Sequence, residues 1–147
     1  MVLVVVLAAL AVLAWTFWLP NDGRLVIHTA KGDYTFFVEV ADTEKSRSYG
    51  LMNRASLAPD RGMLFDYGRE QLAQFWMKDT LIPLDMVFAS ADGTVRTIHE
   101  NARPLDLTGI PSEVPVRFVL EIKGGRSAEI GLKPGDKLEH IRVGAAN

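Results

Sequence analysis

The charged side chains best placed for chemistry lie inside apolar segments of the sequence. The run FWMKDTLIPLDMVF, residues 75–88, carries Lys78, Asp79 and Asp85, and the run VRFVLEI carries Glu121. An unpaired buried charge is costly, so each of these groups must reach water, a partner or a ligand. Two carboxylates such as Asp85 and Glu121 can act as general acid and base where they converge and their environments separate their pKa values.

Other catalytic and metal-binding patterns are missing from the sequence. Cysteine is absent, which excludes disulfides, thiolate nucleophiles and Cys-ligated metals. His28, His99 and His140 are far apart and form neither an H-x-x-x-H nor an H-x-H pattern, so no histidine metal site is predicted. The G-x-S-x-G motif is absent, and Ser127 in GGRSAE is interpreted as a helix N-cap. We therefore expect no metal and no cofactor.

Strands are predicted to carry these charged side chains. Alternation of apolar and polar residues predicts one strand on each side of the turn DTLI. In the first strand Trp76 and Lys78 share a face, and in the second Asp85 lies on the face opposite Met86. One interpretation is an ordinary half-buried hairpin whose charges face solvent. The other is a concave face, lined by Trp76, Lys78 and Asp85, that holds a ligand.

Residues 25–147 are expected to form one β-rich globular domain. The runs LVIHT and YTFFVEV flank the turn AKGD and predict a hairpin. Short helices are expected through EKSRSY, capped by Asp42 or Thr43, and in GGRSAEIGL. About seven strands and two short helices indicate a mainly β (α+β) fold, a small β-barrel or sandwich. The residues interpreted as structural, at helix ends and turns, are Gly50, Gly131, Gly135 and Asp136.

Residues 1–19 form an apolar segment in which Thr16 is the one polar side chain. As a helix rising about 1.5 Å per residue, the segment would span roughly 28 Å, close to a hydrocarbon core of about 30 Å. Its last residues include the aromatic cluster WTFW, typical of a membrane interface, before a linker at residues 20–24. We expect an N-terminal membrane helix that anchors the protein; a cleaved signal segment and a buried core helix are the alternatives.

Charge and composition exclude some partners. The chain has 16 Lys and Arg against 18 Asp and Glu, a net charge of -2, and its basic residues are scattered. A nucleic-acid-binding protein would present a basic face, so no nucleic-acid partner is expected. The expected partner is the membrane, through residues 1–19.

Four ordered blocks of the sequence resemble a known family. These blocks, GLMNRASLAPDRGMLFDY, FWMKDTLIPLDMVF, IHENARPLD and VLEIKGGRSAEIGLKPGD, are similar to the domain of unknown function 192 family over roughly residues 35–143. The resemblance implies a compact β-rich domain of bacteria and archaea, often behind a signal or anchor, with no established activity. It places the family's polar signature on Arg54, Trp76, Lys78, Asp85, Glu121 and Asp136. One departure is Asp79, where the family usually has asparagine.

Three hypotheses about function follow. The favoured one is a non-enzymatic, exported and membrane-tethered module of the cell envelope, accessory or ligand-binding. In it, a small molecule, sugar or peptide binds at a pocket formed by Arg54, Trp76, Lys78, Asp85 and Glu121. The second is a carboxylate-dependent, hydrolase-type enzyme that uses Asp85 or Glu121, with Arg54 or Lys78 steadying an anion. The third is a structural domain with no ligand. As for location, cleavage of the N-terminal segment would make the protein secreted or periplasmic instead of membrane-anchored.

Overall fold

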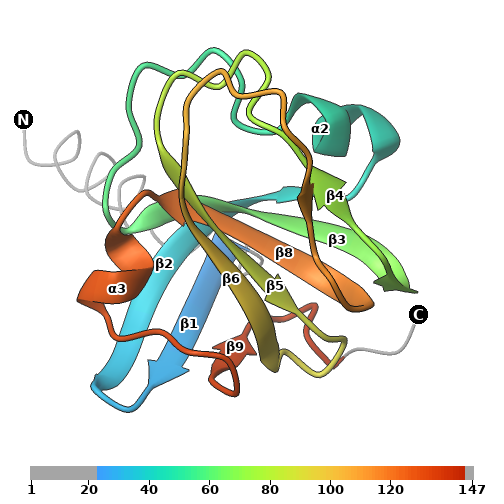
Figure 1. Cartoon of the computed structure of the whole chain (residues 1–147). Coiled ribbons are helices and arrows are strands. Elements are labelled where there is room, and N and C mark those ends of the chain that lie inside the picture. The colour runs from blue at the N-terminus through green and yellow to red at the C-terminus, as the bar shows by residue number, and fades with distance from the viewer. Residues whose placement is uncertain (1–22, 145–147) are drawn as a thin grey trace, which may run out of the picture.

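The computed structural model describes residues 23–144, which form a mainly β fold with two short helices (Figure 1). The elements in chain order are β1 (Arg24–Thr29), β2 (Gly32–Ala41), α2 (Glu44–Tyr49), β3 (Arg61–Gln71), β4 (Gln74–Phe75), β5 (Leu84–Ala89), β6 (Val95–Ala102), β7 (Ile110–Pro111), β8 (Val116–Lys123), α3 (Arg126–Glu129) and β9 (Lys137–Glu139). The first strand therefore begins at Arg24, inside the predicted linker.

Seven of the strands form one curled sheet in the order β6-β5-β8-β3-β2-β1-β9. Neighbouring strands are antiparallel except β2 and β3, which are parallel and joined through α2. The curl brings the two edge strands together where Thr94 and Lys137 form a bridge. The fold is a half-barrel of seven strands with two short helices, which refines the predicted barrel or sandwich; β4 and β7 pair separately.

The first hairpin and the first helix follow the sequence pattern. β1 and β2 pair from Arg24 opposite Phe37 to Thr29 opposite Gly32, which confirms the predicted hairpin. Phe36 is buried and Phe37 exposed, as alternation requires. The Thr43 side chain accepts a hydrogen bond from the Ser46 amide and caps α2, as one of the two predicted caps.

Both faces of the sheet are covered by apolar side chains. The inner cluster, enclosed by the curl, includes Phe36, Leu64, Ile122 and Leu138. On the opposite face lies the outer cluster, which includes Phe65, Phe75, Met77, Met86, Phe88 and Leu51. A sheet buried on both faces explains why all six residues of β5 are buried.

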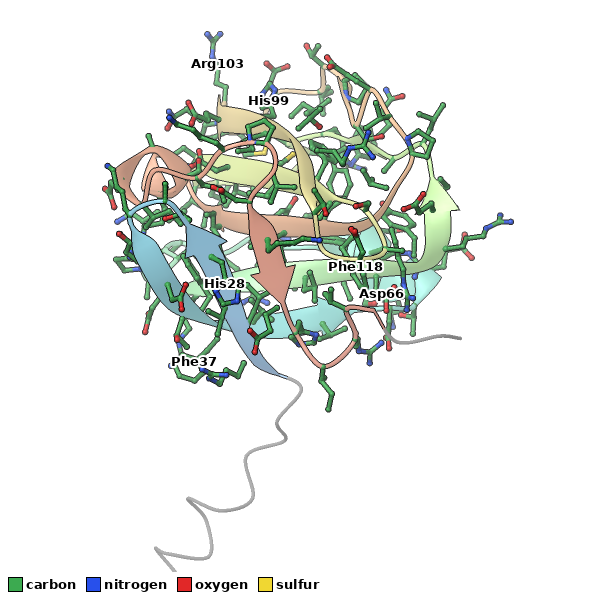
Figure 2. All side chains as sticks on the ribbon, turned by 90° about the horizontal axis from the view of Figure 1, so that it is seen from below. His28, Phe37, Asp66, His99, Arg103 and Phe118 are labelled. Atoms are coloured by element: carbon green, nitrogen blue, oxygen red, sulfur yellow. The ribbon has the colours of Figure 1, made fainter. Side chains whose placement is uncertain are left out.

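A buried ion pair stands at one end of the sheet, where Figure 2 labels Asp66 and Phe118. Arg117 donates from Nε to Oδ1 of Asp66 at 3.0 Å, and the Gly68 amide donates to the same oxygen at 2.8 Å. Burial by itself raises the pKa of Asp66, but these hydrogen bonds outweigh it and hold the pKa below its usual value. Arg142 from the C-terminal turn approaches the other oxygen at 3.6 Å.

The predicted hairpin at residues 75–88 is wrong. β4 ends at Phe75 and pairs with β7, whereas β5 belongs to the large sheet. The cause is the loop after β6, since the Met77 amide donates to the Asp106 carbonyl oxygen instead of to a neighbouring strand. The prediction that Ser127 is an N-cap is also wrong: Gly125 holds that position, and Ser127 lies inside α3 with its hydroxyl bonded to Asp85.

The expected membrane segment, residues 1–19, lies outside the described residues. Within residues 23–144, neither helix is long and apolar enough to span a membrane.

Candidate functional site

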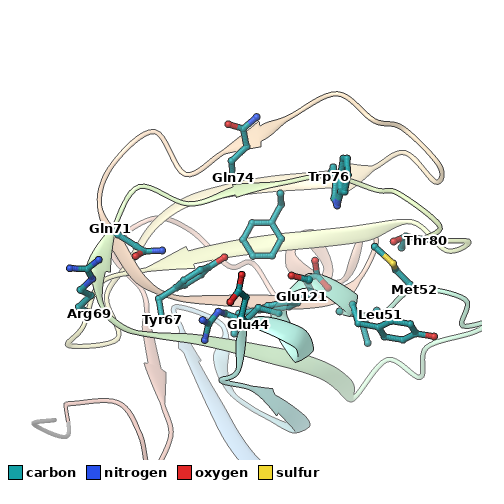
Figure 3. Close-up of a pocket in the computed structure, with 16 residues that line it drawn as sticks. Glu44, Leu51, Met52, Tyr67, Arg69, Gln71, Gln74, Trp76, Thr80 and Glu121 are labelled. Carbon is teal, nitrogen blue, oxygen red and sulfur yellow. The ribbon is translucent and has the colours of Figure 1, made fainter.

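A pocket of about 620 Å³ opens on the outer face of the sheet, between α2 and the chain around β4, and its lining side chains are drawn in Figure 3. Residues from α2 and the turn after it line one side, and β3 and residues 71–80 line the others. The lining residues are Glu44, Arg47, Ser48, Tyr49, Gly50, Leu51, Met52, Phe65, Tyr67, Arg69, Gln71, Gln74, Phe75, Trp76, Thr80 and Glu121. This size falls in the usual range of small-ligand sites.

Glu121 contributes the carboxyl group at the floor of this pocket. It lies in β8 between Met63 of β3 and Met86 of β5, the residues directly opposite it in the neighbouring strands. Its side chain therefore points to the outer face, flanked by two buried methionines. Only 4% of Glu121 is exposed, and this burial raises its pKa to about 8. The carboxyl is therefore mainly protonated at neutral pH.

The Glu121 carboxyl has no hydrogen-bond donor among residues 23–144, because burial is the sole influence on its pKa. Its oxygens are not sealed in the protein either, since no fully buried side-chain oxygen of the described part lacks a partner. The carboxyl therefore opens onto the pocket that it lines. An acid so placed is available to a ligand.

Gly50 allows the chain to pass close to this carboxyl. Its φ is +52°, and a Cβ added there would lie 3.3 Å from Cζ of Phe65 and 3.9 Å from Oε2 of Glu121. A side chain at this position would strain the backbone and fill the pocket next to the acid. Gly50 thus ends α2 and, because it has no side chain, leaves the Glu121 carboxyl accessible from the pocket.

Two further polar groups stand beside Glu121. Arg47 of α2 donates from Nη1 to the Asp66 carbonyl oxygen at 3.1 Å, and its guanidinium lies 5.1 Å from the centre of the Tyr67 ring. Burial raises the pKa of Tyr67, Arg47 lowers it, and Glu121 raises it. Arg47 is thus held by a backbone carbonyl and an aromatic ring, and Tyr67 stays a neutral hydroxyl group facing the acid (Figure 3).

Trp76 stands at the opposite rim, with 48% of its surface exposed. The Lys78 ammonium lies 5.3 Å from the centre of its ring, so this predicted pair does associate. Both residues also line a second hollow, with Lys45, Tyr49 and their neighbours in α2. Trp76 borders both hollows, so the pocket continues across its ring toward Lys78.

Asp85 does not belong to this pocket. It is opposite Ile122 in the pairing of β5 and β8, so it points to the inner face while Glu121 points to the outer one. Asp85 is fully buried and accepts hydrogen bonds from the amides of Asn101, Gly125 and Ser127 at 2.8, 3.0 and 2.9 Å, and from the Ser127 hydroxyl. It therefore fastens the ends of β6 and α3 to β5.

Arg54 and Asp136 also lie away from the pocket lining. Arg54 pairs with Glu39 on the surface, its Nη2 donating at 3.0 Å to Oε1. Asp136 accepts a hydrogen bond from the Lys133 amide at 2.8 Å and braces the turn before β9. In the same corner Gly131 and Gly135 have φ values of +67° and +97°. Of the five predicted ligand-binding residues, Trp76 and Glu121 line the pocket, Lys78 contacts Trp76 but lines only the second hollow, and Arg54 and Asp85 line neither.

The departure at Asp79 has a conformational explanation. Asp79 has a φ of +50°, and its carbonyl oxygen accepts a hydrogen bond from the Asn53 amide at 2.8 Å. Asn and Asp adopt this left-handed region more readily than other non-glycine residues. The position therefore tolerates either side chain for the same backbone reason, and Asp79 is exposed.

Sequence reasoning missed several residues of the pocket, chiefly Glu44, Arg47, Tyr67, Gln71 and Gln74. A usable signal existed for Tyr67, since it follows Phe65 by two residues in a strand and so shares its face. No such signal places α2, because the packing of a six-residue helix on the sheet depends on the whole fold.

His28 and His99 lie on different strands of the sheet. His28 bonds to Asp33 and Glu139 at 2.7 and 2.8 Å on the β1–β9 side, labelled in Figure 2, while His99 is exposed on β6. In the described part of the chain no three His, Asp or Glu residues are grouped so as to hold a metal ion.

The described residues thus form a β-rich half-barrel, and on the outer face of its sheet lies a buried acid, Glu121, with no hydrogen-bond donor among them. The sequence profile of the domain of unknown function 192 family, described as "Uncharacterized ACR", matches residues 26–140. The chain belongs to this family.

Two solved structures have the same fold. A Sinorhizobium meliloti 1021 protein, described as a proposed transcription regulator, is 47% identical, with a TM-score of 0.78 over 80% of this chain and 92% of that one. A protein of unknown function from Novosphingobium aromaticivorans DSM 12444 is 40% identical, with a TM-score of 0.77 over 79% of this chain and 83% of that one. The curated proteins include no match.

Proposed function

We propose that this protein is a ligand-binding module of the cell envelope, exported and tethered to the membrane by residues 1–19. The observation that carries the ligand-binding part is the Glu121 carboxyl, which opens into the pocket without a hydrogen-bond donor from the described residues. The exposed Trp76 ring offers a flat apolar surface beside it. An aromatic platform with a few convergent polar groups suits a sugar or a peptide.

Binding is testable through Trp76 itself. The other two of the three tryptophans lie in residues 1–19, so replacing Trp15 and Trp18 by phenylalanine leaves Trp76 as the single emitter. Titration of this variant with short peptides and oligosaccharides is expected to change Trp76 fluorescence saturably for one class. A Glu121→Leu substitution should abolish the response. A flat response to both classes would contradict the proposal.

The cellular location rests on the apolar segment of residues 1–19. Fractionation should place the 147-residue chain with membranes, with its globular domain accessible to protease from outside the cytoplasm. The mass of the purified protein separates an anchor from a cleaved signal. Recovery of the intact chain in the cytoplasmic fraction would contradict the proposal. A role in transcription is not proposed, because the net charge is -2 and the basic residues form no run.

One observation favours an enzyme as a second candidate. A carboxyl whose pKa is about 8 is protonated at neutral pH and can serve as a general acid in a pocket. Glu121 would act without Asp85, since the two carboxyls face opposite sides of the sheet. Turnover of a glycoside, ester or peptide substrate that is lost in Glu121→Gln would support this candidate over simple binding.

A further inference from the structure

Arg47 and Arg69 line the pocket, but no basic side chain of residues 23–144 pairs with Glu121. The titratable side chains that face Glu121 are Glu44, Arg47 and Tyr49 from α2, and Tyr67 and Arg69 from β3. Residues 71–80 contribute only uncharged side chains to the lining. Arg47 is engaged by the Asp66 carbonyl oxygen and the Tyr67 ring, and none of the basic groups lowers the pKa of Glu121. A cationic partner for the ionised form of Glu121 can therefore come from a ligand.

The walls around this acid are aromatic. Phe65, Tyr67, Phe75 and Trp76 all line the pocket, and Phe65 and Phe75 meet edge to face with centroids 5.0 Å apart. Aromatic faces attract cations, an effect that strengthens when the cation is desolvated. Two rings of this wall already have cations of the protein over them, Lys78 at Trp76 and Arg47 at Tyr67.

The aromatic wall and the carboxyl at its base, which has no donor among residues 23–144, favour a cationic group. We infer that the pocket binds its ligand through a protonated amine or guanidinium group, which pairs with the Glu121 carboxylate and packs against the aromatic side chains. The inference rests on the proposed function and specifies its ligand. A lysine or arginine side chain of a peptide and a free alkylamine share this chemistry, and the experiment below separates them.

Cationic and neutral ligands pair with different protonation states of Glu121. A cation pairs with the ionised form of Glu121, so binding releases a proton and strengthens as the pH rises toward 8. A neutral hydroxyl or amide ligand can pair with the protonated form, whose population does not grow over this range. With a free pKa of about 8, the ionised fraction and hence the affinity for a cation should rise roughly fiftyfold from pH 6 to pH 8.

The test uses the 147-residue chain in nonionic detergent with Trp15 and Trp18 replaced by phenylalanine. Trp76 fluorescence follows titration with Nα-acetyl-lysine methylamide, with its Nε-acetylated form, which carries no charge, and with butylammonium. The lysine amine stays protonated below pH about 10, so the pH profile reports on the protein. Glu121→Gln should weaken lysine binding at pH 8 by roughly tenfold or more, whereas Glu100→Gln, the same change at an exposed residue of β6, should not.

The possible outcomes distinguish a cationic ligand from a neutral one and from none. Tighter binding of the charged probe, increasing from pH 6 to pH 8, supports the inference; butylammonium then binds as well if a free amine suffices and fails if the peptide part is needed. Equal binding of the charged and acetylated probes overturns the inference but leaves the proposed function standing. Saturable binding of oligosaccharides alone also overturns the inference and leaves the proposed function standing. If no probe of either class binds saturably, both the inference and the proposed function are overturned.

Discussion

Replacing Glu121 by glutamine is expected to remove a pH-dependent destabilisation of the folded domain. Burial raises the pKa of this carboxyl from 4.5 to about 8. Below pH 4.5 the acid is protonated in both folded and unfolded chains, so it imposes no penalty. As the pH rises, the unfolded chain releases the proton first and the folded chain keeps it until about pH 8, so stability falls over this interval.

The magnitude follows from the size of the shift. Each pKa unit is worth about 1.4 kcal/mol, so a shift from 4.5 to about 8 corresponds to a full penalty of about 5 kcal/mol above pH 8. Between pH 5 and pH 8 the wild-type chain should lose about 3 kcal/mol relative to Glu121→Gln. Glutamine is nearly isosteric and uncharged, so packing against Met63 and Met86 is preserved.

Urea unfolding at pH 5, 6, 7 and 8, followed by circular dichroism, measures this difference. Glu100→Gln serves as the control, because Glu100 is exposed on β6 and its replacement should leave the pH dependence unchanged. Parallel stability profiles for wild type and Glu121→Gln would show that the Glu121 pKa is not raised in the folded domain. Such a result would mean that water or another group stabilises the ionised carboxyl in the pocket.

Three further predictions concern the parts that hold the pocket in place. Asp85→Ala should lower the free energy of unfolding by about 3 kcal/mol or more, because it leaves three buried amide donors without an acceptor. Asp85→Asn keeps one acceptor oxygen and should cost less. A loss below about 1 kcal/mol in urea unfolding of the alanine variant would contradict this role. Asp66→Asn should remove the part of the acid unfolding profile that depends on this carboxylate. In the wild-type chain the ion pair stabilises the fold above pH 3.8 and is lost as the pH falls through the lowered pKa of Asp66. Identical acid unfolding profiles of the two chains would be inconsistent with the ion pair. Thr43→Ala should cost about 1 kcal/mol through loss of the α2 cap, whereas Thr43→Ser should retain it, and thermal unfolding distinguishes the two.

Local elements of the fold were predictable from the sequence because their causes are local. The β1–β2 hairpin follows from alternation around AKGD, and α2 begins at a residue that can cap it. The segment at residues 75–88 was mispredicted because its pairing is set elsewhere. Met77 bonds to Asp106 and β4 pairs with β7, and neither partner is visible in the pattern of the segment itself.

The candidate site was predictable only in part. An apolar strand interrupted by an acid identified both Asp85 and Glu121, but the sequence does not give the register of β5 on β8. That register sets the two carboxyls on opposite faces, one held by backbone amides and the other open to a pocket. The difference between an acid bonded to backbone amides and an acid that opens onto a pocket is therefore a property of strand pairing, which depends on contacts distant in the sequence.

Whether Glu121 pairs with a cationic ligand can be measured through the pKa of its carboxyl, with and without a bound cation. Carbon-13 labelling of glutamate and an NMR titration of its carboxyl signal, assigned through Glu121→Gln, give this pKa in the 147-residue chain. We expect a pKa of about 8 in the free protein and a clearly lower pKa with saturating Nα-acetyl-lysine methylamide. An ordinary carboxyl pKa in the free protein, or a raised pKa that the lysine probe leaves unchanged, would contradict this expectation.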